Sequence, residues 1–335
     1  MISTIRLCCL AIALLSCTAL AEPTTRPQAG KPLLLVLCKA ENQLALVDPD
    51  RMKLLAKMPT GNGPHEVAAS ADGKLAFVSN YGDQKAAGST LSVFDLVEQK
   101  VLRTVDLGVL RRPHGIVAAS NGKVFFTAEL NAVVGRYDPA TDKLDGLTGT
   151  GAAISHMLAR DEKIGRIYTA NIMSDSVSVI DPRGPFPKIT QIKAHKSPEG
   201  IALSPDGKSL WVGNNKSNDI VVIDTTANEI VQTIPCGNSG VPIRLAFAPD
   251  GKHVLASDAK NGDVIVFDPE TFKEAGRVHV GEVPVGITVS TDSQRAFVAT
   301  TGDGHVSCLD LAKLAVTSSL EIGEQPDGVA WVAAR

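Results

Sequence analysis

A repeating unit of four short strands constrains this chain more than any other feature of its sequence. The clearest copy runs from Ser197 to Gly237 and contains four apolar runs, which begin at Gly200, Ser209, Ile220 and Ile230. Turn residues such as Pro205-Asp206-Gly207 separate these runs, a pattern typical of consecutive antiparallel strands. The runs barely alternate between apolar and polar residues, so we expect neighbouring sheets to cover both faces of this small sheet.

The same unit recurs along the whole chain. Its third strand ends in an aspartate seven times, at intervals of 42 to 47 residues: Asp48, Asp95, Asp138, Asp181, Asp224, Asp268 and Asp310. Four-strand units repeated at this period are typical of propeller blades. The sequence therefore predicts an all-β fold, a seven-bladed β-propeller with four antiparallel strands per blade. We number the blades 1 to 7 in the order of these aspartates, which we interpret as turn caps and not as catalytic acids.

The two ends of the propeller are predicted to share one blade. Leu33 to Met58 supplies only the last three strands of blade 1, and the missing first strand appears at the other end as Gly328 to Trp331. A mixed N- and C-terminal blade would close the ring and remove two exposed sheet edges. We therefore expect residues 33–335 to form a single domain, although length alone would suggest two.

Residues 1–21 have the features of a secretory signal peptide. They contain one positive charge at Arg6, an apolar core and the cleavage motif Ala19-Leu20-Ala21, and they are too short to span a membrane. An alternative is a lipoprotein signal, which would anchor the chain through Cys17. Residues 22–32 read as a linker rich in proline and threonine. We expect an exported protein, periplasmic or extracellular, without a transmembrane span.

Composition excludes some classes of function. A net charge of −3 provides no basic surface for nucleic acid. The hydrophobic fraction of 44% is ample for a core. We expect the protein to be a monomer. Cys38, Cys236 and Cys308 lie on unlike strands of different blades. An odd number of cysteines at unlike positions argues against a disulfide framework, so we predict three free thiols.

A family resemblance follows from the motif Pro-x-Gly-Ile-Ala-x-Ser-Pro-Asp-Gly, continued by a Leu-x-Val-x-Asn strand and a Val-x-Val-Ile-Asp strand. Ser197 to Asp224 carries it best, and blades 2, 6 and 7 also fit. The chain from Leu33 onward resembles the YVTN/YncE-like seven-bladed propellers. Blade 3, with Pro113-His-Gly-Ile116, is similar to streptogramin-lyase and NHL repeats. The resemblance implies the fold; its members include secreted binding proteins and lactonase-like enzymes, so it implies no single function.

The second residue of each inner strand differs between blades. In ring order from blade 1 it is Asp327, His65, His114, His156, Glu199, Ile243 and Val285. The first strand of a propeller blade is the innermost, so these residues should lie at one mouth of the central channel. Five neighbouring blades would then present side chains suited to bind a ligand. The three imidazoles could converge on one metal ion, with bonds of about 2.0–2.1 Å for zinc.

Two further residues stand out near this mouth. The ends of the second strands form a further predicted ring: Cys38, Asn80, Glu129, Asn171, Asn214, Asp258 and Thr300. Glu129 is the exception between two asparagines, which makes it a candidate general base, or a partner that orients His114. Arg244 is expected to hold a carboxylate or phosphate. The alternative is that the histidines are repeat variants that only hydrogen-bond neighbouring loops.

Two functional classes remain open from the sequence. The first is a secreted or periplasmic binding propeller, whose polar mouth and loop face hold a small ligand or a partner protein. The second is a metal-dependent lactonase- or lyase-like enzyme, in which histidines and carboxylates hold a divalent cation that polarises a carbonyl or activates water. No motif for nucleophilic catalysis, P-loop or dinucleotide fingerprint occurs. The binding protein is the leading hypothesis, and a divalent metal is the cofactor expected for the alternative.

Overall fold

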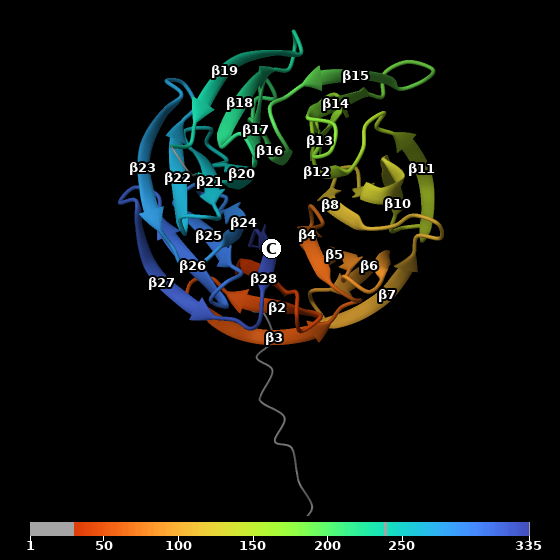
Figure 1. Cartoon of the computed structure of the whole chain (residues 1–335). Coiled ribbons are helices and arrows are strands. Elements are labelled where there is room, and N and C mark those ends of the chain that lie inside the picture. The colour runs from red at the N-terminus through yellow and green to blue at the C-terminus, as the bar shows by residue number, and fades with distance from the viewer. Residues whose placement is uncertain (1–29, 238–239, 335) are drawn as a thin grey trace, which may run out of the picture.

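The computed structural model describes residues 30–237 and 240–334. They form seven four-stranded antiparallel sheets around a common axis, which confirms the seven-bladed propeller (Figure 1). The predicted signal peptide, residues 1–21, and most of the predicted linker lie outside the described residues. Within the described residues, no helix is long and apolar enough to cross a membrane.

Six blades run from the axis to the rim in chain order, and blade 1 takes its innermost strand from the C-terminal end of the propeller (Figure 1). The first, innermost strands are β4 (Pro64–Ala69), β8 (Pro113–Ala118), β12 (Ser155–Arg160), β16 (Pro198–Leu203), β20 (Pro242–Phe247), β24 (Pro284–Val289) and β28 (Pro326–Val332). The second strands are β1 (Leu33–Cys38), β5 (Leu75–Gly82), β9 (Val124–Ala128), β13 (Ile167–Asn171), β17 (Ser209–Asn214), β21 (Val254–Asp258) and β25 (Arg295–Thr300). Each innermost strand contacts that of the next blade, so the seven form a closed ring.

In the outer half of each blade, exposure to solvent rises from the third strand to the fourth, outermost strand. The third strands are β2 (Gln43–Asp48), β6 (Ala87–Asp95), β10 (Val133–Asp138), β14 (Ser176–Asp181), β18 (Asp219–Asp224), β22 (Asp263–Asp268) and β26 (His305–Asp310). The fourth strands are β3 (Lys53–Pro59), β7 (Lys100–Asp106), β11 (Lys143–Gly149), β15 (Lys188–Lys193), β19 (Glu229–Pro235), β23 (Lys273–His279) and β27 (Ala315–Glu321). A 3₁₀ turn, η1 (Glu129–Asn131), follows β9 in blade 3.

The core lies between adjacent blades, as the weak alternation of the middle strands predicts. Ile220 to Ile223 of β18 are all buried, whereas β19 alternates between exposed and half-buried residues. Trp211 is fully buried and fills the space between blades 5 and 6, with its ring 6.0 Å from that of Phe267. Burial of each large apolar side chain contributes roughly 1.5–3 kcal/mol. The fold therefore depends on apolar strands and does not require the polar residues near the axis.

The seven strand-end aspartates act as turn caps, as predicted. In every blade one carboxylate oxygen accepts the backbone N–H two residues further on, for example from Thr226 to Asp224 and from Ala312 to Asp310. This is the Asx turn, in which the side chain takes the place of a backbone acceptor. These carboxylates therefore serve the architecture.

Blade 1 closes the ring as the sequence predicted. Its strand order is β28-β1-β2-β3. Strand β28 pairs antiparallel with β1, with Leu34 opposite Trp331 and Val36 opposite Val329. Trp331 also stacks on Phe297 of blade 7, with ring centroids 5.6 Å apart. The C-terminal strand thus pairs with β1 and also contacts blades 2 and 7, which flank blade 1.

Within the described residues, Cys38, Cys236 and Cys308 are free and buried. Burial raises the pKa of Cys38 to about 11 and that of Cys236 to about 12, and it also raises the pKa of Cys308. A thiol with a raised pKa stays protonated at pH 8, and the protonated form is a poor nucleophile.

We therefore expect iodoacetamide at pH 8 to label the native protein slowly and to label all three thiols once denaturant is added. Mass spectrometry without reductant measures both. The prediction is wrong if the denatured chain, cleaved after residue 21, takes up fewer than three labels, because a missing label would mean a disulfide.

Candidate functional site

The channel mouth is the end of the ring at which the seven innermost strands begin. Here a β-bulge re-aims the second residue of the strand. In blade 2, Pro64 lies opposite Asn80 and Glu66 opposite Ser79, so His65 is the extra residue of the bulge. The same shift follows Pro198 in blade 5. A bulged residue is released from the regular alternation of the strand, which lets these side chains turn towards the axis.

The three predicted histidines meet at this mouth. His114 is fully buried and lies between the other two. Its ring centroid is 3.6 Å from that of His156 and 4.2 Å from that of His65. The imidazoles come from blades 2, 3 and 4 and face one another, instead of pointing outward into separate loops.

Three predicted carboxylates surround the imidazoles. His65 Nδ1 lies 3.0 Å from Asp327 Oδ2, an ion-pair distance without the alignment of a hydrogen bond. His156 Nδ1 contacts Glu129 Oε1, and its Nε2 lies 3.7 Å from Glu199 Oε1. Glu129 therefore partners His156, although the sequence suggested His114. We call the eight residues of this arrangement the mouth cluster: His65, Glu66, His114, Glu129, His156, Glu199, Arg244 and Asp327.

Glu66 is a member that the sequence analysis missed. Arg244, on blade 6, reaches across the axis to Glu66, on blade 2: its Nε donates to Glu66 Oε1 at 3.1 Å, and its Nη1 lies 3.9 Å from Glu199 Oε1. The carboxylate that Arg244 holds is thus the protein's own. A charged residue directly after His65 inside an inner strand was the available signal.

Among the described residues, Glu129 is the one member of the predicted second-strand ring that joins the mouth cluster. Its neighbours point into their own blades: Asn80 Nδ2 donates to Ser92, and Asn171 Nδ2 donates to Ser178. In blade 3, Ala128 and not Glu129 lies opposite the inner-strand proline, as Asn80 does in blade 2, so the prediction placed Glu129 one residue too early in the repeat. Glu129 follows the end of β9 and begins η1. The predicted second ring is therefore largely structural.

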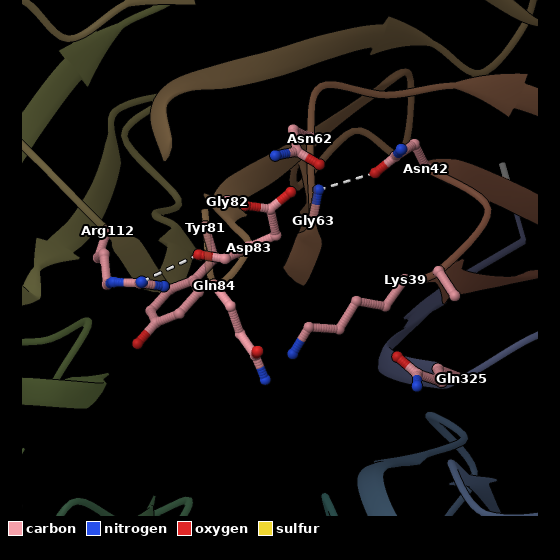
Figure 2. Close-up of a pocket in the computed structure, with 11 residues that line it drawn as sticks. Lys39, Asn42, Asn62, Gly63, Tyr81, Gly82, Asp83, Gln84, Arg112 and Gln325 are labelled. Atoms are coloured by element: carbon pink, nitrogen blue, oxygen red, sulfur yellow. Dashed lines mark hydrogen bonds between the residues drawn. The ribbon is translucent and has the colours of Figure 1, made fainter. Parts of the chain in front are cut away.

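A pocket of about 530 Å³ opens beside the cluster, between blades 1, 2 and 3 (Figure 2). Tyr81 and Lys39, both in its lining, connect it to the cluster. Tyr81 donates its hydroxyl hydrogen to Glu129 Oε2 at 2.6 Å, and Lys39 Nζ lies 3.4 Å from Asp327 Oδ2. The guanidinium of Arg112 lies 4.5 Å from the Tyr81 ring centroid. The sequence analysis missed all three: Tyr81 lies near the end of β5, Lys39 directly follows β1, and Arg112 directly precedes β8.

Several buried polar atoms of the mouth cluster lack a protein partner. Among the described residues, neither ring nitrogen of His114 has a hydrogen-bond partner, and the same holds for His156 Nε2 and Asp327 Oδ1. A buried donor or acceptor without a partner costs about 1–3 kcal/mol, so native proteins rarely leave one. With His65 Nδ1, the mouth cluster therefore offers five such atoms to a partner from outside the chain.

The surroundings of the cluster shift the pKa values of His114, Glu129 and Asp327 away from their usual ranges. Burial, followed by the charges of His156 and His65, holds the pKa of His114 well below its usual range, so the ring is neutral. Burial opposes ionisation of Glu129, but the hydrogen bond and charge of His156 outweigh it and lower the pKa of Glu129. The pKa of Asp327 is lowered against burial mainly by the charge of His65. The mouth therefore combines a neutral imidazole with ionised carboxylates.

Two groups within the cluster have the composition of a metal site. One is His65, Glu66 and His114, and the other is His114, Glu129 and His156; the ligand atoms of each group lie within 4.8 Å of one another. A tetrahedral ion with bonds of about 2.0–2.1 Å places its ligand atoms about 3.4 Å apart. The side chains of either group would have to rotate to bring their ligand atoms into that range.

Fold and site together define a class: a seven-bladed propeller with a histidine and carboxylate cluster at one channel mouth. The model of the YncE-like β-propeller family matches residues 144–334. The chain belongs to this family. No curated protein matches the sequence.

Solved structures of similar fold have low sequence identity to this chain. Hydrazine synthase of Kuenenia stuttgartiensis matches with a TM-score of 0.75 and 16% identity, over 87% of this chain and 98% of that one. A protein of unknown function from Desulfotomaculum acetoxidans matches with a TM-score of 0.76 and 14% identity, over 90% of this chain and 99% of that one. A protein from Bacteroides uniformis, named as a candidate 6-phosphogluconolactonase, matches with a TM-score of 0.73 and 18% identity. The match covers 90% of this chain and 100% of that one. At these identities the likeness shows the fold alone.

Proposed function

We propose that this protein is an exported binding propeller that takes a small ligand at its channel mouth. The carrying observation is the group of buried, unpartnered atoms of His114, His156 and Asp327. They are recessed among the inner strands, so a small molecule or ion can reach them more readily than a protein surface can. The adjacent pocket of about 530 Å³ lies within the range of small-molecule sites, about 300–1,000 Å³. Export follows from the signal peptide expected in residues 1–21.

Replacement of His114 with alanine tests this proposal. The His114 ring makes no hydrogen bond within the described residues, and the backbone carbonyl that accepts from Ser79 Oγ is kept in the variant. The variant should therefore melt close to the wild type. Native mass spectrometry should show a bound mass on the wild type that the variant lacks. His279→Ala, which removes a histidine with a side chain 74% exposed at the rim, is the matched control and should keep the bound mass. A large fall in Tm with no bound mass in either protein would show that His114 is structural.

An enzyme is the second candidate, favoured by the surroundings of Glu129. Its carboxylate is buried, is held by Tyr81 and His156, and lies within 4.8 Å of a His114 nitrogen. A carboxylate so fixed can act as a general base towards water at a carbonyl. The name of the Bacteroides uniformis neighbour makes a lactone a reasonable substrate class to test. Hydrolysis of δ-gluconolactone in a pH-stat, lost in Glu129→Gln, would favour the enzyme; a wild-type rate equal to the buffer rate would exclude this substrate.

A further inference from the structure

The charges of the mouth cluster indicate what kind of ligand it takes. Four of its members are carboxylates: Glu66, Glu129, Glu199 and Asp327. Two cations contact them, Arg244 and Lys39. The carboxylates thus outnumber the fixed cations of the site by two. Buried charges without compensation are costly, so an anionic ligand would be repelled and a divalent cation would balance the site.

The excess charge is not spread evenly over the cluster. Glu66 is held by the guanidinium of Arg244, and Asp327 by Lys39 and His65. Glu129 has only uncharged or titratable partners, Tyr81 and His156, and within the described residues no lysine or arginine forms an ion pair with it. A cation is therefore drawn to the group that contains Glu129. The competing group contains Glu66, where the fixed charge of Arg244 would repel it.

We propose that His114, Glu129 and His156 hold a divalent first-row transition metal ion. This rests on the proposed function and names the ligand of that same site. Two imidazoles and one carboxylate suit zinc, cobalt, nickel or ferrous iron, whereas calcium and magnesium prefer oxygen ligands throughout. All three side chains are buried, and His114 has both nitrogens without a protein partner. The ion would take the place of the proton between His156 Nδ1 and Glu129 Oε1, and the neutral ring would then carry its one proton on Nε2.

Two neighbours would position these ligands without touching the ion. With His156 Nδ1 on the metal, the ring carries its proton on Nε2, which faces Glu199 Oε1 at 3.7 Å. Tyr81 donates to Glu129 Oε2 at 2.6 Å and leaves Oε1 for the ion. Such outer partners fix the tautomer and orientation of metal ligands, and their loss typically weakens metal binding about 10- to 100-fold. Glu199 and Tyr81 are therefore positioning residues.

Calorimetric titration of chelator-treated protein with ZnCl₂ tests the site. We expect one ion per chain, binding weakened at least about 100-fold in His114→Ala and His156→Ala, and binding weakened about 10-fold in Tyr81→Phe. His279→Ala should bind as the wild type does, and CaCl₂ should give no comparable heat. Cobalt should give visible d–d absorption in the wild type that both histidine variants lack.

Equal zinc affinity in the wild type and His114→Ala, or no stoichiometric binding at all, overturns the metal proposal. These outcomes differ from failure of the proposed function. If native mass spectrometry shows an organic mass that depends on His114 while zinc does not bind, the mouth is a ligand site for another molecule. If neither is bound, both proposals fail.

Discussion

Deletion of residues 324–335 is expected to abolish cooperative folding. It removes β28, the innermost strand of blade 1, and leaves the edge of β1 unpaired. It also removes the apolar contacts of Trp331 and Val332 with blades 7 and 1. A propeller stays closed only if both ends of its chain join one sheet, and an open ring exposes edges that aggregate. Circular dichroism on heating should show no sharp transition for the truncated chain.

The control for this deletion removes only residues 333–335. Strand β28 ends at Val332, so the shorter deletion keeps every pairing of the closing blade. It should melt as the full chain does. A chain without residues 324–335 that keeps an unchanged melting transition would contradict the role assigned to blade 1.

Arg244→Met is expected to cause the largest loss of stability among single substitutions at the channel mouth. It leaves the Glu66 side chain buried and without its guanidinium partner across the axis. Removal of one partner of a buried ion pair costs about 3–5 kcal/mol. In a domain of this size that corresponds to a fall in Tm on the order of 10 °C, which differential scanning fluorimetry can measure.

Two variants separate this effect from a general effect of charge removal. Glu66→Gln combined with Arg244→Met removes both charges and should recover part of the lost stability. Lys313→Met removes an exposed partner of Asp310 and should change Tm little, because exposed pairs contribute little. A Tm for Arg244→Met within 2 °C of the wild type would show that the pair does not hold the two sides of the mouth together.

The fold could be predicted because its constraints are local and repeated. Each strand-end aspartate makes a bond to the backbone two residues on, as in Asp224 and Asp310, so the signal lies within a few residues of sequence. The count of seven such signals, with a first strand missing at one end and present at the other, was sufficient to predict the closed ring.

The mouth cluster could be predicted only in part. His65, His114 and His156 occupy equivalent repeat positions, so alignment of the repeats placed them together. Glu66 follows His65 in a regular strand position, and only the bulge brings both towards the axis. Tyr81, in β5, and Lys39, just after β1, occupy the same repeat position as Glu129, directly after the residue opposite the inner-strand proline. They were missed because the repeat alignment placed Glu129 one residue too early and grouped it with Asn80 and Cys38.

The most direct test of the proposed metal site is a crystal structure of the zinc-loaded protein with anomalous data at the zinc edge. We expect one strong peak at the channel mouth, about 2.0–2.2 Å from a His114 nitrogen, His156 Nδ1 and Glu129 Oε1. Peaks only at rim histidines such as His279, with none at the mouth, would contradict it.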